Sequence, residues 1–66
     1  MFVNNFKIAR IKAGYTQIEL AEKLDTDYVQ LCRYESGKGY PRIDRLIKMA
    51  DILNVSVDYL LGRVND

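Results

Sequence analysis

Residues 16–37 read TQIELAEKLDTDYVQLCRYESG, and this stretch decides the fold. Its first four residues predict a capping box, in which the Thr16 side chain accepts a hydrogen bond from the amide three residues on and Glu19 reaches back to the Thr16 amide. Asp27 and Gln30 predict a second box of the same kind. The pattern therefore predicts two short helices, each with its own start, joined by a turn of about three residues.

The flanking residues predict three more helices. One is expected over about residues 5–13 and ends at a glycine cap. Another follows Pro41 and stops at Asn54, and a short last helix starts after Ser56. The residues expected to face the core from these helices are Phe6, Ala9, Ala13, Ile43, Leu46, Ile47, Ala50, Leu53, Val57, Leu60 and Leu61. Within residues 16–37 the core candidates are Leu20, Ala21, Leu24, Leu31 and Tyr34. The extreme N-terminus is the one place where the sequence still allows a strand. The predicted fold is therefore all-α with five short helices.

Size and composition favour one small globular domain over residues 1–66. The chain has a single cysteine, Cys32, so neither an intrachain disulfide nor a cysteine zinc site can form, and it has no histidine. The usual general base and the commonest metal ligand are therefore missing, and no nucleophile–base set can be named. We expect no enzyme activity, no cofactor and no metal. No apolar run approaches the roughly 20 residues that span a bilayer, and no basic segment precedes the apolar start, so a cytoplasmic location is expected.

The net charge of +1 is low for a nucleic-acid binder. Its distribution is more informative, because residues 33–48 hold five cations against two anions, a local charge of +3. The cations are Arg33, Lys38, Arg42, Arg45 and Lys48. Affinity for DNA depends on cations that face phosphates, so this segment is compatible with a DNA-binding surface.

Two short helices joined by a tight turn allow one helix to brace across the DNA backbone while the other enters the major groove. That geometry alone is not specific. The sequence, however, resembles the XRE family of helix-turn-helix regulators, the phage Cro and repressor family, in Thr16-Gln17, in residues 19–24, in residues 33–38 with Pro41, and in residues 54–62. The resemblance covers about residues 5–62. It implies a compact five-helix, lambda-repressor-like domain that binds operator DNA, usually as a homodimer, to regulate transcription.

The third helix carries the candidate base-reading residues. At 100° per residue, Leu31 and Tyr34 define its buried side. The opposite side holds Val29, Cys32, Arg33 and Ser36, with Tyr28 and Gln30 on the flanks. In the family, the groove-reading residues occupy the first, second, third and sixth positions of this helix, which here are Tyr28, Val29, Gln30 and Arg33. Arginine can contact guanine through two hydrogen bonds, glutamine can pair with adenine, and valine suits a thymine methyl.

Phosphate contacts are expected from residues around this helix. Gln17, assisted by Thr16, lies at the N-terminus of the second helix, where the helix dipole favours an anion. Lys38 and Arg42 can hold the DNA backbone, or Arg42 can enter the minor groove. Arg42 stands where the family often has a capping Ser or Thr, which favours a DNA role for its side chain. For each cation the alternative is a solvated surface charge.

Several positions depart from the family pattern or have a structural interpretation. Asp25 replaces a usual glycine in the turn, and Asp27 replaces the usual Ser or Thr and adds a carboxylate near the DNA. Glu35 falls on the buried side of the wheel. In the family an acidic residue here commonly pairs with a basic one on the first helix, for which Arg10 is the candidate. Cys32 is either a redox switch or, as we favour, a small residue where the family often has serine.

The alternative function is a protein-interaction module, such as an antitoxin or anti-regulator component. The low charge and the apolar ends, residues 1–3 and 59–64, fit a partner surface and fit a self-dimer equally well. Groove-facing Gln30 and Arg33 have no obvious purpose in a pure protein binder, so a repressor that binds double-stranded DNA as a homodimer is the favoured prediction. Its dimer interface is expected at the fifth helix and the chain ends, through Tyr59, Leu60 and Val64. No small-molecule ligand is evident.

Overall fold

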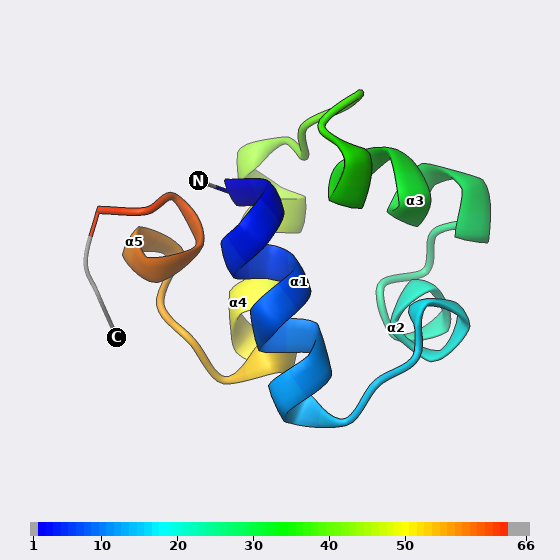
Figure 1. The fold of residues 1–66 in the computed structure, drawn as a ribbon, viewed down its shortest axis with the longest axis horizontal. Coiled ribbons are helices and arrows are strands. Elements are labelled where there is room, and N and C mark those ends of the chain that lie inside the picture. Colours follow the sequence, from blue (N-terminus) through cyan, green and yellow to red (C-terminus); the bar gives the residue numbers. More distant parts are fainter. Residues whose placement is uncertain (1, 64–66) are drawn as a thin grey trace.

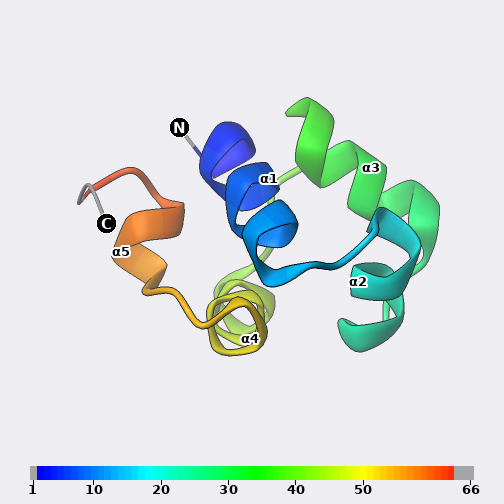
Figure 2. The ribbon, with the colours of Figure 1, turned by 60° about the horizontal axis from the view of Figure 1, so that its bottom comes forward.

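The computed structural model describes residues 2–63, which fold into five helices without a strand. The helices are α1 (Phe2–Ala13), α2 (Gln17–Lys23), α3 (Tyr28–Ser36), α4 (Ile43–Leu53) and α5 (Val57–Leu60). α1 runs through the middle, with α5 on one side of it, α2 and α3 on the other, and α4 packed across one face (Figures 1 and 2). The predicted all-α fold with five short helices is confirmed. Within the described range, no helix has the length and apolar character needed to cross a membrane.

α1 begins earlier than the sequence predicts. Phe2 lies in its first turn, is only 7% exposed, and stacks on Phe6 with ring centroids 5.3 Å apart. Residues four apart share a helix face, so Phe2 continues the buried face of α1 and belongs to the core, not to a strand or a partner surface. Asn4 and Asn5 hid this continuation, because asparagine is a poor helix former. The Asn5 side chain donates to the Tyr59 carbonyl oxygen at 2.7 Å and ties α1 to α5.

One hydrophobic core collects side chains from all five helices. Its buried members are Phe2, Phe6, Ala9, Leu20, Ala21, Leu24, Leu31, Tyr34, Leu46, Met49, Ala50, Leu53 and Leu60. All five core candidates from residues 16–37 are among them, so that part of the prediction is confirmed. Residues 16–37, which have the best-defined helix starts, therefore also bury the side chains that the helical wheel predicts.

Four predicted core positions are wrong. Ala13 is exposed at the end of α1, and Ile43, Ile47 and Leu61 are 65%, 48% and 44% exposed. The buried stripe of α4 consists of Leu46, Met49, Ala50 and Leu53. This stripe has the same helical spacing as the predicted one, so spacing alone cannot choose between them. The side of α4 that meets α1 and α5 decides which residues are buried, and that is tertiary information.

The caps around α2 and α3 set the two helix starts. The Glu19 amide donates to Thr16 Oγ1 at 3.1 Å and the Thr16 amide donates to Glu19 Oε1 at 2.8 Å, which confirms the predicted capping box. The bond from the Thr16 amide lowers the pKa of the Glu19 carboxyl, because it stabilises the charged form. At α3 the Gln30 amide donates to Asp27 Oδ1 at 2.8 Å, and only this half of the second predicted box forms. Between the helices Asp25 takes the left-handed conformation, with φ 55°, that its glycine-like position requires.

Candidate functional site

α3 lies at the edge of the molecule (Figure 1). Its two faces differ chemically. Its buried side is as predicted, because Leu31 is fully buried and Tyr34 is 6% exposed. Its outer face is formed by four exposed side chains, which are Tyr28, Val29, Arg33 and Ser36. Gln30 and Cys32 are half-buried at the borders of this face. The wheel therefore gives the correct exposure for the predicted base-reading residues, while their contacts with bases stay a prediction.

Glu35 fixes α3 against α1. Arg10 Nε donates to Glu35 Oε2 at 2.6 Å, and the two side chains are only 11% and 5% exposed. Arg10 also donates from Nη1 to the Tyr15 carbonyl oxygen at 2.8 Å, so its guanidinium group is held from two directions. The pairing predicted for these two residues is confirmed. Because both charges are nearly buried, this contact limits how far α3 can tilt relative to α1.

The same carboxylate also holds the start of α2. Gln17 Nε2 donates to Glu35 Oε1 at 3.0 Å, and the Tyr28 hydroxyl lies 3.4 Å from Gln17 Oε1 as donor. Sequence reasoning missed this network, since it depends on the angle between α2 and α3. One amide hydrogen of Gln17 is thus already used inside the domain. A phosphate contact from Gln17 stays a prediction, and it would use the backbone N–H at the start of α2 or the remaining hydrogen of the side-chain amide.

Tyr28 is the first residue of α3 and also interacts with Cys32, one turn later. Hydrogen bonding to the Cys32 side chain raises the pKa of the Tyr28 hydroxyl, with smaller contributions from the charge of the thiolate form and from burial. The ordinary pKa of tyrosine already keeps the hydroxyl protonated at neutral pH, so it remains a hydrogen-bond donor. Cys32 is a free thiol in a half-buried position.

The segment that joins α3 to α4 lies next to the outer face of α3. Gly37 takes the left-handed conformation, with φ 81°, and its amide donates to the Arg33 carbonyl oxygen. Lys38 is exposed, and Arg42 is the N-cap residue of α4, with an exposed side chain that makes no capping bond. A cleft of about 410 Å³ opens here, lined by Gln30, Tyr34, Tyr40, Arg42, Asp44 and Arg45.

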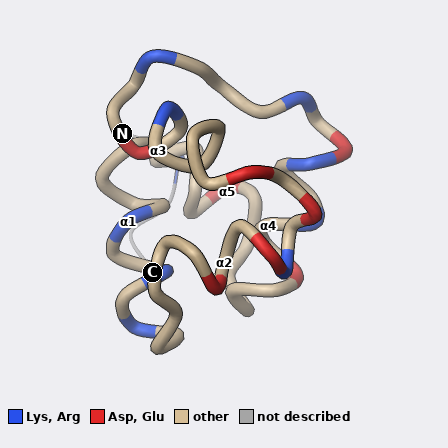
Figure 3. The backbone as a smooth tube through the Cα atoms, turned by 90° about the vertical axis from the view of Figure 1, so that its right-hand side faces the viewer, with Lys and Arg blue, Asp and Glu red and all other residues tan. Residues whose placement is uncertain are grey.

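The five cations of residues 33–48 divide into two groups. Arg45 Nη1 donates to the Leu24 carbonyl oxygen at 2.8 Å, and Lys48 Nζ lies 3.2 Å from Asp25 Oδ2. These two side chains hold α4 against the end of α2 and the turn after it. Arg33, Lys38 and Arg42 remain exposed. Figure 3 shows Lys and Arg positions along the loop between α3 and α4, whereas acidic positions mark α2.

The structure corrects one of the three predicted dimer-interface residues. Leu60 is fully buried in the core, so it cannot lie in an interface while the domain keeps this fold. Tyr59 is half-buried and packs against the core, and Val64 lies outside the described residues. Helical spacing identified the apolar residues of α5 but not which of them face α1 and α4.

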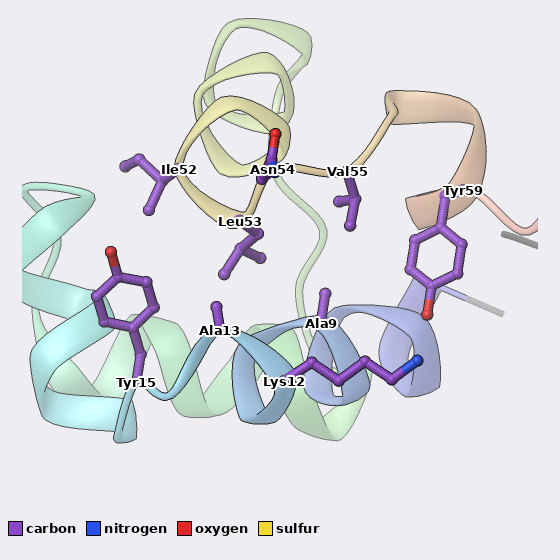
Figure 4. Close-up of a pocket in the computed structure, with 9 residues that line it drawn as sticks. All are labelled: Ala9, Lys12, Ala13, Tyr15, Ile52, Leu53, Asn54, Val55 and Tyr59. Atoms are coloured by element: carbon purple, nitrogen blue, oxygen red, sulfur yellow. The ribbon is translucent and has the colours of Figure 1, made fainter.

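A second hollow lies away from α3, between the end of α1 and the segment from α4 to α5 (Figure 4). Its volume is about 530 Å³. The lining residues are Ala9, Lys12, Ala13, Tyr15, Ile52, Leu53, Asn54, Val55 and Tyr59. Lys12 is the one charged side chain in this lining.

Comparisons with known proteins agree with the geometry of α2 and α3. The helix-turn-helix family profile matches residues 6–60. The HTH-type transcriptional regulator ImmR of Bacillus subtilis (strain 168) is 51% identical over 57 residues, which cover 86% of this chain and 45% of that protein. The cryptic phage CTXphi transcriptional repressor RstR of Vibrio cholerae is 40% identical over 48 residues, which cover 73% of this chain and 43% of that protein.

The sign of regulation differs among the similar proteins. The HTH-type transcriptional activator BcrR of Enterococcus faecalis is 36% identical over 60 residues, which cover 88% of this chain and 29% of that protein. The chain thus spans less than half the length of these three relatives. No solved structure matches it significantly.

Proposed function

Because this chain belongs to the helix-turn-helix family of transcriptional regulators that its sequence resembles, the XRE family, we propose that it binds a pseudo-palindromic operator in double-stranded DNA as a homodimer. α3 would enter the major groove, and residues 1–66 would act as a single DNA-binding domain. The family is one of DNA-binding regulators and not an enzyme class. Action on DNA would place the protein in the cytoplasm.

The observation that carries this proposal is the outer face of α3. Val29 is 65% exposed there, beside the exposed Arg33. An apolar side chain next to a guanidinium group matches the edge of a thymine–guanine step, where a methyl group and two acceptors lie side by side. Tyr28, Val29, Gln30 and Arg33 would read the bases. Ser36 and Cys32 would lie near the groove without a fixed partner.

Backbone contacts would come from the residues around α3. Lys38 and Arg42 are exposed on its C-terminal side, and Thr16 and Gln17 precede or start α2 on the other. Cations in these places neutralise phosphates and fix the register of the domain on the duplex, but they carry no sequence information themselves. Asp25 and Asp27 lie close by and repel phosphates, so we expect modest affinity that is sensitive to salt, with a slope set by the number of phosphates that the cations neutralise.

The dimer would use α5 and the C-terminal segment, through Tyr59 and Val64. Leu61, 44% exposed, is the apolar residue of α5 best suited to join them. Such a dimer would hold two α3 helices about 34 Å apart, over half-sites about 10 bp apart. Repression is the proposed effect, as for the repressor RstR, although BcrR shows that similar proteins include an activator.

Selection of bound duplexes from a random DNA pool tests the proposal. We expect an enriched pseudo-palindrome, and analytical ultracentrifugation is expected to find two chains on that duplex. A single chain on the enriched site would contradict the homodimer alone. Failure to enrich any motif would contradict DNA reading and favour the protein-interaction module, such as an antitoxin or anti-regulator component. One argument for that alternative was the apolar N-terminal end as a partner surface. This argument is weakened, because Phe2 is buried in the core.

A further inference from the structure

We propose that Gly39, in the loop between α3 and α4, is a specificity-determining position, because glycine there leaves the side chains of Gln30 and Arg33 the room that base reading requires. The inference rests on the proposed function and names a residue outside the recognition helix. Gly39 would touch no base itself. A larger residue there would act through the two side chains that it displaces.

The contact is close and involves both side chains. A Cβ atom at position 39 would lie 3.6 Å from Gln30 Nε2, 3.8 Å from Arg33 Cβ and 3.9 Å from Arg33 Nε. These are ordinary van der Waals distances, so one methyl group fits, but a longer side chain directed toward α3 would enter the space that the ends of Gln30 and Arg33 occupy. The absence of a side chain at Gly39 therefore leaves room in which both ends lie.

The conformation of Gly39 does not explain why glycine is present. Gly14, Gly37 and Gly62 have positive φ, whereas Gly39 lies outside that region. An L-residue at position 39 thus brings no backbone strain of the kind that it would bring at Gly37. What glycine provides at position 39 is room beside α3.

The loop is anchored on both sides of Gly39. On one side the Lys38 amide donates to the Arg33 carbonyl oxygen at 3.0 Å. On the other side the Tyr40 ring packs edge-on against Phe2, with ring centroids 6.0 Å apart. Position 39 lies between these two anchors, so a bulky side chain there would displace the flexible ends of Gln30 and Arg33 more readily than the loop.

Displacement would change base reading because the contacts proposed for these residues are bidentate. Two parallel hydrogen bonds to adenine or guanine require the amide or guanidinium plane to lie in the plane of the base. Gln30 is half-buried beside the cleft, so part of the space around it is already filled. A bulky residue at position 39 would therefore change which base each side chain can reach, while the phosphate contacts stay unaffected.

The test compares duplexes selected by the wild-type chain and by Gly39→Leu. We expect the leucine variant to lose roughly five- to 150-fold in discrimination at the base pairs read by Gln30 and Arg33, the worth of a bidentate contact. Gly39→Ala should give the smallest shift of the series, because its methyl group only reaches van der Waals contact. Thermal unfolding followed by circular dichroism checks the fold. If the leucine variant unfolds, Gly39→Val carries the same test with a smaller side chain.

A double-mutant comparison shows whether a residue at position 39 acts through Gln30 and Arg33 or through its own contact with the DNA. In a chain that already carries Gln30→Ala and Arg33→Ala, adding Gly39→Leu should change base preference no further, because no side chain remains to be displaced. An equal loss of affinity on all sequences, in both backgrounds, would show a clash with the DNA backbone and overturn the inference. Unchanged preference in Gly39→Leu, with a motif still enriched by the wild-type chain, would overturn it as well. A wild-type chain that enriches nothing would overturn the proposed function, and this inference with it.

Discussion

The inner and outer faces of α3 differ in burial and in their contacts, although both belong to one short helix. The inner face buries Leu31 and Tyr34 and carries Glu35, whose carboxylate is held by α1 and α2. The outer face exposes Val29 and Arg33. Changes on the inner face are therefore expected to alter the free energy of unfolding, and changes on the outer face to alter DNA binding without altering stability.

The inner face also explains how such a short helix could present a rigid surface for the proposed base reading. A nine-residue helix is unstable alone in water, so its conformation depends on tertiary contacts. Glu35 supplies such a contact through Arg10 and Gln17, which come from the two helices packed against α3. The orientation of the outer face is thus set by contacts on the inner face, through groups that would never touch the DNA.

Replacing Glu35 with Gln should give the largest effect on the inner face. The substitution keeps the shape but leaves the guanidinium group of Arg10, which is 11% exposed, without its opposite charge. Removing one partner of a nearly buried pair costs about 3–5 kcal/mol, which approaches the whole stability of a domain this small. Urea unfolding followed by circular dichroism measures the loss. A matched apolar pair, Arg10→Met with Glu35→Leu, should unfold at a higher urea concentration than Glu35→Gln, and the opposite order would show that the charge pair itself supplies the stability.

On the outer face, Arg33→Ala should weaken binding to the selected operator by about 1–3 kcal/mol and relax the preference at one base pair. Because Arg33 is exposed, the midpoint of urea unfolding should hardly move. Titration of the operator and of single-base variants by fluorescence anisotropy measures both quantities. An equal loss on all sequences would identify Arg33 as a phosphate contact.

The two faces also show what the sequence could and could not predict. The helix starts depend on local hydrogen bonds, so the capping box of Thr16 and Glu19 was readable from their spacing. The inner face of α3 was readable from the helical period. Spacing places Ile43 and Ile47 in the core, but the structure exposes both, because α4 has apolar residues on more than one stripe and only its neighbours select the buried one. Spacing leaves Leu60 open to both the core and the dimer interface, and the structure buries it in the core.

Long-range polar contacts were readable only where a family pattern pointed to them. The pairing of Arg10 with Glu35 came from such a resemblance, and the structure confirms it. The bond from Gln17 to Glu35 and the room that Gly39 leaves beside α3 depend on angles between elements that no spacing encodes. Local sequence patterns thus predict most of the fold of this chain. The detailed geometry of the candidate site depends on tertiary contacts that these patterns do not encode.

Lys38→Ala sharpens the comparison by removing an exposed cation close to the outer face but not on it. If Lys38 neutralises one phosphate, affinity should fall by a similar factor on all sequences, and the slope of log affinity against log salt should decrease by about one unit. Base preference should stay unchanged. Anisotropy titrations at several salt concentrations provide the slope, with Arg33→Ala as the contrasting variant. A changed preference at one base pair would place Lys38 in the reading set.

The smallest effect is expected where a charge pair of the same kind lies on the surface. Lys48 and Asp25 form an ion pair at 3.2 Å, with side chains 45% and 85% exposed, and they tie α4 to the turn before α3. Water and salt screen such a pair, so Lys48→Ala should cost at most about 1 kcal/mol of unfolding free energy, and less at high salt. Urea unfolding at low and high salt measures the change beside Glu35→Gln. A loss of unfolding free energy as large as that of Glu35→Gln would contradict this expectation. It would mean that the exposed pair stabilises the domain as much as the nearly buried pair does.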